Sequence, residues 1–165
     1  MRHALAFVAA GVVSWPVAAA AHHRDRPDLA VAGTLTTEVV ACSSLCTESE
    51  WTGRLDGTSS FSLISMEDAD IPNENVSQFH GNLVLSTARG ELIGTDLGLW
   101  NLDSGQYVDV YTVTAGTDEL AGATGTILLF GTLDPVSGAG FSHYKGTIRF
   151  RDSDDRGHGG RCDDH

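Results

Sequence analysis

Between residues 29 and 150 the chain alternates short apolar stretches with glycine-rich or polar turns, and apolar residues do not recur at helical spacing. β-Branched and aromatic residues dominate the apolar stretches, which is typical of strands. A polar loop is expected after the first strand, and another loop at 68–78. The pattern predicts seven or eight strands, at 31–42, 51–66 (one strand or two short ones), 79–87, 90–100, 106–114, 125–133 and 140–150.

Glycines inside several of these strands favour one all-β architecture over another. Glycine weakens an ordinary strand, but a barrel uses it where the sheet must bend to close. A sandwich has less need of such residues, and closure also removes the sheet edges through which secreted β proteins aggregate. We therefore predict a single small antiparallel β-barrel of about eight strands, and the glycines concerned are Gly81, Gly94, Gly98, Gly131 and Gly146.

Residues 1–21 have the features of a secretory signal peptide. Arg2 and His3 precede a run of small and apolar residues that ends in four alanines. A transmembrane anchor is the alternative, but the run is barely long enough, and Ser14 and Pro16 interrupt it. We predict a secreted or periplasmic bacterial protein that has no membrane association once the signal is removed.

The remaining chain divides into a linker at 22–28, the barrel domain at 29–150 and an acidic tail at 151–165 that is expected to be disordered. The formal net charge is −12. A surface this negative repels phosphate groups, so nucleic acid and anionic membranes are not expected as partners. The glycine patterns of nucleotide-binding loops and the GxSxG motif are missing, so kinase, dehydrogenase and hydrolase functions are unsupported and no cofactor is expected.

The chain contains three cysteines, Cys42, Cys46 and Cys162. In an oxidising compartment, Cys42 and Cys46 can form a local disulfide that closes the loop after the first strand. Zinc binding is the alternative, but two further ligands would be needed and none lies nearby in the sequence. We predict the Cys42–Cys46 disulfide, which leaves Cys162 free or available to link two chains.

The segments TAGTDELAGATGT (114–126) and FGTLDPVSGAGFSHYKGTI (130–148) share a glycine pattern with a known family. They resemble the GGTGxFxGAxG segment of bacterial secreted proteins with an allene oxide cyclase-like barrel, and more distantly they are similar to plant dirigent proteins. The pattern departs from the family at Ala115, Asp118 and Leu120, which replace Gly, Gly and Phe.

The resemblance covers about residues 79–150 and implies an allene oxide cyclase-like or calycin-like barrel. Its glycines, Gly116, Gly122 and Gly125, would allow positive φ or tight backbone approach, and Asp118 tolerates the left-handed region better than most residues. The family includes cyclases, stereochemical guides and proteins of other roles, so membership implies the fold more than an activity.

Alternation along 90–100 places Leu92, Gly94, Asp96, Gly98 and Trp100 on one face. If this face lines the barrel, Asp96 is a carboxyl group in an apolar cavity beside Trp100, and burial would raise its pKa and suit it to general acid or base work. The alternative is a hydrogen-bonded structural Asp.

Along 106–114, Tyr107, Asp109 and Tyr111 share one face, and β-branched residues share the other. The aromatic face could bind a planar ligand, which makes Tyr107 and Tyr111 candidate binding residues together with Trp100. It could equally be a solvated outer surface with the β-branched face as core, which is the assignment we prefer.

In the last strand, alternation points Tyr144 inward as the best candidate for a hydroxyl inside a cavity, and His143 outward. His80 is also expected at the surface, opposite the apolar face of its strand. Asp96 and Tyr144 are therefore the candidate catalytic residues.

Two weak metal sites are also conceivable. Cleavage after Ala19 or Ala20 would leave a mature chain whose third residue is His22 or His23, and a free amine, two backbone nitrogens and that imidazole suit Cu(II) or Ni(II). Cleavage after Ala21 would abolish this set. The tail could also bind divalent ions loosely through His158, Cys162 and His165, although a solvated acidic tail is the usual explanation.

Three functions follow from these patterns. The first is a non-enzymatic barrel that binds an apolar small molecule or acts as a surface component. The second, in line with the family resemblance, is an isomerase or cyclase that positions a substrate in the cavity while Asp96 manages a proton. The third is metal capture by the termini. A cavity with Asp96 or Tyr144 pointing into it would favour the enzyme, and a filled interior would leave the other two.

Overall fold

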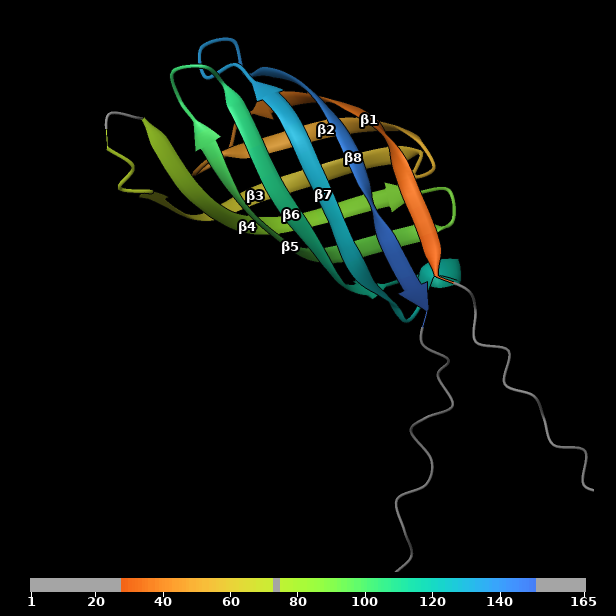
Figure 1. Ribbon diagram of the computed structural model, residues 1–165. Helices are drawn as coiled ribbons and strands as arrows, with labels where there is room; N and C mark the ends of the chain where they lie inside the picture. Colours follow the sequence, from red (N-terminus) through yellow and green to blue (C-terminus); the bar gives the residue numbers. More distant parts are fainter. Residues whose placement is uncertain (1–27, 73–74, 151–165) are drawn as a thin grey trace, which may run out of the picture.

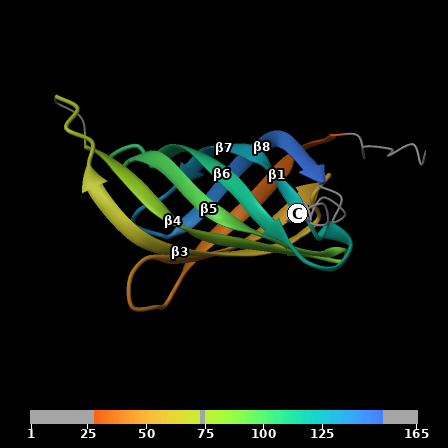
Figure 2. The same cartoon turned by 90° about the horizontal axis from the view of Figure 1, so that it is seen from below.

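The computed structural model describes residues 28–72 and 75–150, which form a closed antiparallel barrel of eight strands (Figures 1 and 2). Each strand pairs with the next in the chain, and the last pairs with the first to close the ring. The predicted barrel is confirmed. The strands are β1 (Leu29–Val40), β2 (Cys46–Gly53), β3 (Gly57–Asp68), β4 (Val76–Thr87), β5 (Gly90–Asn101), β6 (Gln106–Gly116), β7 (Ala123–Leu133) and β8 (Ala139–Phe150).

The strands are strongly tilted, so those on opposite sides of the barrel cross in projection (Figure 1). β1 begins and β8 ends at the same end of the barrel. The predicted signal peptide, the acidic tail and all but the last residue of the predicted linker lie outside the described residues. Within the described ranges, none of the helical structure is long and apolar enough to cross a bilayer.

The segment 51–66, predicted as one strand or two, forms two. β2 begins at Cys46 rather than at Trp51, so the loop expected before Trp51 is shorter than predicted. Glu48 and Glu50 suggested a loop, but they point outward from a strand whose inner face carries two small hydroxyl side chains and one indole ring. Those inward residues are Thr47, Ser49 and Trp51.

The predicted disulfide is present between Cys42 and Cys46, and it joins the loop after β1 to the first residue of β2. It therefore braces the chain where it reverses direction between the first two strands. Cys162 lies outside the described residues.

One half of the barrel interior is packed solid. It lies beside the β2–β3, β4–β5 and β6–β7 connections, and two of these connections contribute Leu55 and Leu120 to the packing. Leu120 belongs to a short 3-10 turn, η1 (Asp118–Leu120), in which Asp118 has φ +49° and the following Gly122 has φ +76°. The left-handed positions expected there are confirmed. The other residues of this half are Val31, Leu85, Leu92, Val113, Ala123, Ile127 and Ile148.

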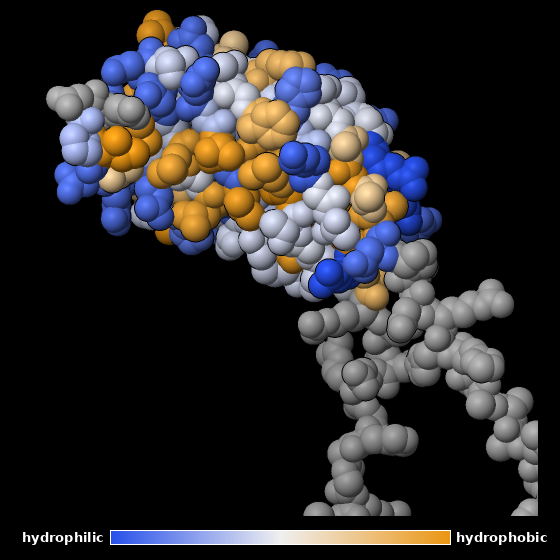
Figure 3. All heavy atoms as spheres, in the orientation of Figure 1, coloured by the Kyte–Doolittle hydropathy of each residue, from blue (hydrophilic) through white to orange (hydrophobic). Residues whose placement is uncertain are grey.

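β6 faces the opposite way from the preferred assignment. Asp109 and Tyr111 are buried inside the barrel, whereas Val108 and Val110 are exposed. The rule that puts the β-branched face inside fails here because the interior at this level is a cavity with polar groups rather than a solid apolar core. Outside, β6 joins other exposed apolar residues: Leu99 of β5 and Phe130 of β7 lie opposite Val108. Figure 3 shows this apolar surface over β5, β6 and β7.

Candidate functional site

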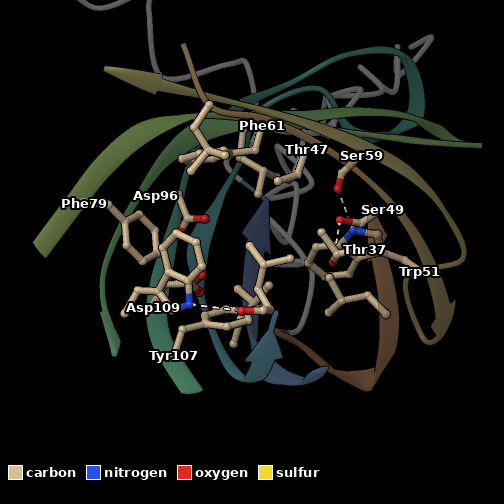
Figure 4. Close-up of a pocket in the computed structure, with 16 residues that line it drawn as sticks. Thr37, Thr47, Ser49, Trp51, Ser59, Phe61, Phe79, Asp96, Tyr107 and Asp109 are labelled. Atoms are coloured by element: carbon tan, nitrogen blue, oxygen red, sulfur yellow. Dashed lines mark hydrogen bonds between the residues drawn. The ribbon is translucent and has the colours of Figure 1, made fainter. Parts of the chain in front are cut away.

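The other half of the barrel contains a cavity of about 60 Å³ (Figure 4). It lies beside the β1–β2, β3–β4, β5–β6 and β7–β8 connections. Three half-buried residues of its lining lie at this end, Leu45 in the β1–β2 connection and Phe79 and Tyr107 near the ends of their strands, so the cavity opens toward this end. Leucine and phenylalanine side chains supply most of the apolar lining, namely Leu35, Phe61, Leu83, Leu129 and Leu133.

Two carboxyl groups, those of Asp96 on β5 and Asp109 on β6, line the cavity. They are only 3% and 4% exposed. The register places Gly98 directly opposite Asp109, with Asp96 two residues away on the same face. The two Asp side chains are therefore diagonal neighbours across one strand pair.

Gly98 makes room for this arrangement. A Cβ atom at that position would lie 2.5 Å from the Cβ of Asp109 and 2.6 Å from Cζ of Phe79. Because Gly98 has no side chain, Asp109 and Phe79 can both lie over the β5 backbone beside Asp96 (Figure 4). The same glycine thus positions the second carboxyl group and one aromatic wall of the cavity.

The two carboxyl groups are within hydrogen-bonding distance of each other. Burial raises the pKa of Asp96 to about 7, and burial together with the charge of Asp96 raises the pKa of Asp109 well above its usual value. Two carboxylates cannot hydrogen-bond unless one carries a proton, so near neutral pH Asp109 holds it. The Oδ1 atoms of both groups have no hydrogen-bond partner among the described residues.

Two of the predicted binding residues, Trp100 and Tyr107, lie in the same wall as Asp96. The indole nitrogen of Trp100 donates to the carbonyl oxygen of Leu133 at 3.2 Å, and the hydroxyl of Tyr107 accepts from Ser142 at 2.6 Å. Burial and the charge of Asp109 raise the pKa of Tyr107, so its phenol remains neutral. Both rings are therefore held in fixed positions.

Tyr111 and Tyr144 point inward but do not line the cavity. Tyr111 donates to the carbonyl oxygen of Leu92 at 2.7 Å. The hydroxyl of Tyr144 accepts from the backbone N–H of Leu55 at 2.8 Å, and its ring packs on Trp51 with centroids 4.7 Å apart. Tyr144 thus ties the β2–β3 turn to the packed half, and the structure does not bring this hydroxyl to Asp96.

Opposite the acidic wall, β1, β2 and β3 present a row of small hydroxyl side chains that the sequence analysis did not single out (Figure 4). The hydroxyls of Thr37 and Ser49 lie 2.9 Å apart, and the indole of Trp51 donates to Ser59 at 2.8 Å. The sequence of β2 contains a pattern that could have identified this row: Thr47 and Ser49 alternate with glutamates at a period of two, as the two faces of a strand do.

Asp109 and Phe79 were also missed as site residues. The preferred assignment of 106–114 puts Asp109 on the solvated face, and alternation along 79–87 does not single out Phe79. Phe79 packs edge-on against Phe61, with centroids 6.0 Å apart, and both rings line the cavity. Their proximity depends on how β3 and β4 pair, which a pattern within one strand does not reveal.

No group of three or more His, Cys, Asp or Glu side chains that could hold a metal ion occurs within 28–72 and 75–150. The candidate metal ligands His22, His23, His158, Cys162 and His165 lie outside these ranges. His143 is exposed, as predicted, and it contacts the rings of Phe130 and Phe141 on the outer surface; His80 is half-buried.

No protein-family model, curated protein or solved structure matches this chain. The resemblance to allene oxide cyclase-like barrels therefore stays a prediction. What the structure contributes is the closed eight-stranded barrel and the cavity within it.

Proposed function

We propose that this chain is an exported barrel protein that binds a small molecule in the cavity beside Asp96. The observation that carries the proposal is a preformed cavity whose wall combines aromatic rings with two buried carboxyl groups. Internal voids and buried oxygens without donors both cost free energy, so neither benefits folding alone. The Cys42–Cys46 disulfide supports the exported part of the proposal, because such bonds persist in oxidising compartments.

The size of the cavity limits the ligand. One water molecule needs roughly 10–15 Å³ of such volume, so about 60 Å³ has room for about four to six non-hydrogen atoms. At a ceiling of about 1.5 kcal/mol per atom, the dissociation constant of such a ligand would be no tighter than roughly micromolar. A larger ligand would place only one end in the cavity and leave the rest at the open end.

The test uses a neutral probe of this size, 1-butanol, followed by NMR through the indole signals of Trp51 and Trp100, which both line the cavity. We expect saturable shifts. Thr47→Phe fills the cavity from β2 and should abolish binding, whereas Thr58→Phe places the same ring on the outer face of β3 and should not change it. Equal binding by both variants, or no saturable shift for the native protein, would refute the proposal.

A second candidate, an isomerase or cyclase, is favoured by one specific observation. Asp96 has a pKa near 7 in an apolar site, which suits a general base, and the protonated Asp109 beside it would donate a hydrogen bond to negative charge developing on a substrate. Against it, a cavity of about 60 Å³ is too small to enclose the folded chain of a cyclisation substrate. Proton transfer on a small carbonyl compound is the form of catalysis that the volume allows.

This second function would appear as deuterium exchange from heavy water into the α-carbons of cyclopentanone, measured by NMR. Asp96→Asn should abolish the exchange without lowering thermal stability. Asp56→Asn, in the exposed β2–β3 turn, is the matched control and should leave the rate unchanged. A native rate equal to that of buffer would exclude this activity for the probe.

A further inference from the structure

We infer that the ligand carries a primary ammonium group, which the cavity holds between the carboxyl groups of Asp96 and Asp109 with a short apolar chain against the surrounding rings. This inference rests on the proposed small-molecule binding and specifies the class of ligand. It starts from two side chains, each more than nine-tenths buried, whose Oδ1 atoms have no hydrogen-bond donor among the described residues. Both side chains line the cavity rather than the packed half.

The charge around the pair is the second argument. No Lys, Arg or His side chain lines the cavity in the part of the chain that the structure describes. The pair therefore has no internal counter-ion when Asp96 is ionised, and a buried charge without a partner is strongly unfavourable. A cation supplied by a ligand would remove this cost, and the net charge of −12 would attract such a ligand to the protein.

The lining favours an organic cation over a metal ion. Calcium takes six to eight oxygen ligands, but beside the two carboxyl groups lie the apolar or aromatic side chains of Phe79, Trp100 and Tyr107. A primary ammonium group needs only three acceptors for its three N–H bonds. The aromatic faces add cation–π attraction, and leucine side chains accommodate the carbon chain.

The pair also makes binding depend on pH. The titratable groups that face Asp96 and Asp109 are Tyr107 and Tyr111, both on β6, and the pKa of each tyrosine is raised, so neither ionises near neutral pH. From β4 the pair is faced by Phe79 and the backbone of Gly81, and neither titrates. From β1, β2 and β3 across the cavity the side chains are hydroxyl or apolar, and from β8 Ser142 approaches Tyr107. The ionisation of Asp96 is thus the step that controls the charge of the cavity.

The experiment compares n-butylamine with 1-butanol, two probes of equal size that differ in charge at pH 8. For the native protein we expect butylamine to bind at least tenfold more tightly than butanol. The double variant Asp96→Asn, Asp109→Asn should lose at least tenfold in affinity for butylamine and keep its affinity for butanol within about threefold. Asp56→Asn is again the surface control and should change neither.

A pH titration of the native protein keeps the inference testable even if the double variant does not fold. Because the pKa of Asp96 is about 7, butylamine affinity should fall by about tenfold for each pH unit below 7, whereas butanol affinity should not change. If butanol binds as tightly as butylamine, or if butylamine binding is independent of pH, the ammonium inference is wrong and small-molecule binding stands. If neither probe binds, both proposals fall.

Discussion

Raising the pH from 4 to 8 is predicted to destabilise the barrel, because it forces a charge onto a carboxyl group buried between β5 and β6. Asp96 has a higher pKa in the folded protein, about 7, than its ordinary value of 3.8. A group of this kind binds its proton more tightly in the folded state. Its contribution to stability is complete below the unfolded pKa and is lost as the pH rises through the folded pKa.

The magnitude follows from the size of the shift. A change from 3.8 to about 7 is about three pKa units, and at about 1.4 kcal/mol per unit it amounts to about 4 kcal/mol lost between pH 4 and 8. Asp109, whose pKa is also raised, adds a further loss at higher pH. For a domain of this size, 4 kcal/mol corresponds to roughly 10–20 °C in melting temperature.

The assay is urea unfolding at pH 4, 5, 6, 7 and 8, with the native protein compared with the double variant Asp96→Asn, Asp109→Asn. The difference between the two isolates the buried pair, because all other carboxyl groups are common to both. Among these is Asp134, whose pKa is lowered by the backbone N–H groups of Val136 and Ser137, so that its contribution is lost as the pH falls. If the native protein and the variant show the same dependence on pH, the two carboxyl groups are not buried as described and the reasoning is refuted.

Three further variants test the barrel and the arrangement around its cavity. Gly98→Ala should cost about 1–3 kcal/mol in urea unfolding and weaken the pH dependence, because the added methyl group displaces the side chains that lie over this glycine. Tyr144→Phe should cost about 1–3 kcal/mol by leaving the N–H of Leu55 without its acceptor, yet leave probe binding unchanged; lost binding would contradict its structural role. Replacing both Cys42 and Cys46 by Ser should cost only about 2 kcal/mol, since the closed loop is short, and a much larger loss of stability would contradict this estimate.

The barrel could be predicted from the sequence because its strands are local patterns. Each of the segments 79–87, 90–100 and 140–150 is a short stretch with apolar residues bounded by turn residues, and each becomes a strand within a few residues of the expected bounds. The start of β2 could not be placed, because its inward face carries threonine and serine instead of apolar residues. Without an apolar period, a strand beside a polar cavity looks like a loop.

Half of the site could be predicted and half could not. Asp96 was identified because its strand carries glycines on the same face, and those glycines point to the interior of a barrel. Asp109 was assigned to the solvent because alternation distinguishes two faces without saying which is inside. That information lies in the register, which pairs Gly98 with Asp109 and so puts both on the interior face.

β6 contradicts the usual polarity of a strand twice, with Asp109 inside and valines outside, and the two exceptions have a common cause. Turning the strand over would bury Val108 and Val110, but it would also take Asp109 away from Asp96 and leave a buried carboxyl group without a neighbour with which to share a proton. Selection for stability alone would favour an apolar residue in place of Asp109. Proteins depart from the usual polarity of a strand mainly where function requires it. The inverted polarity of β6 is therefore a further argument for the proposed small-molecule binding.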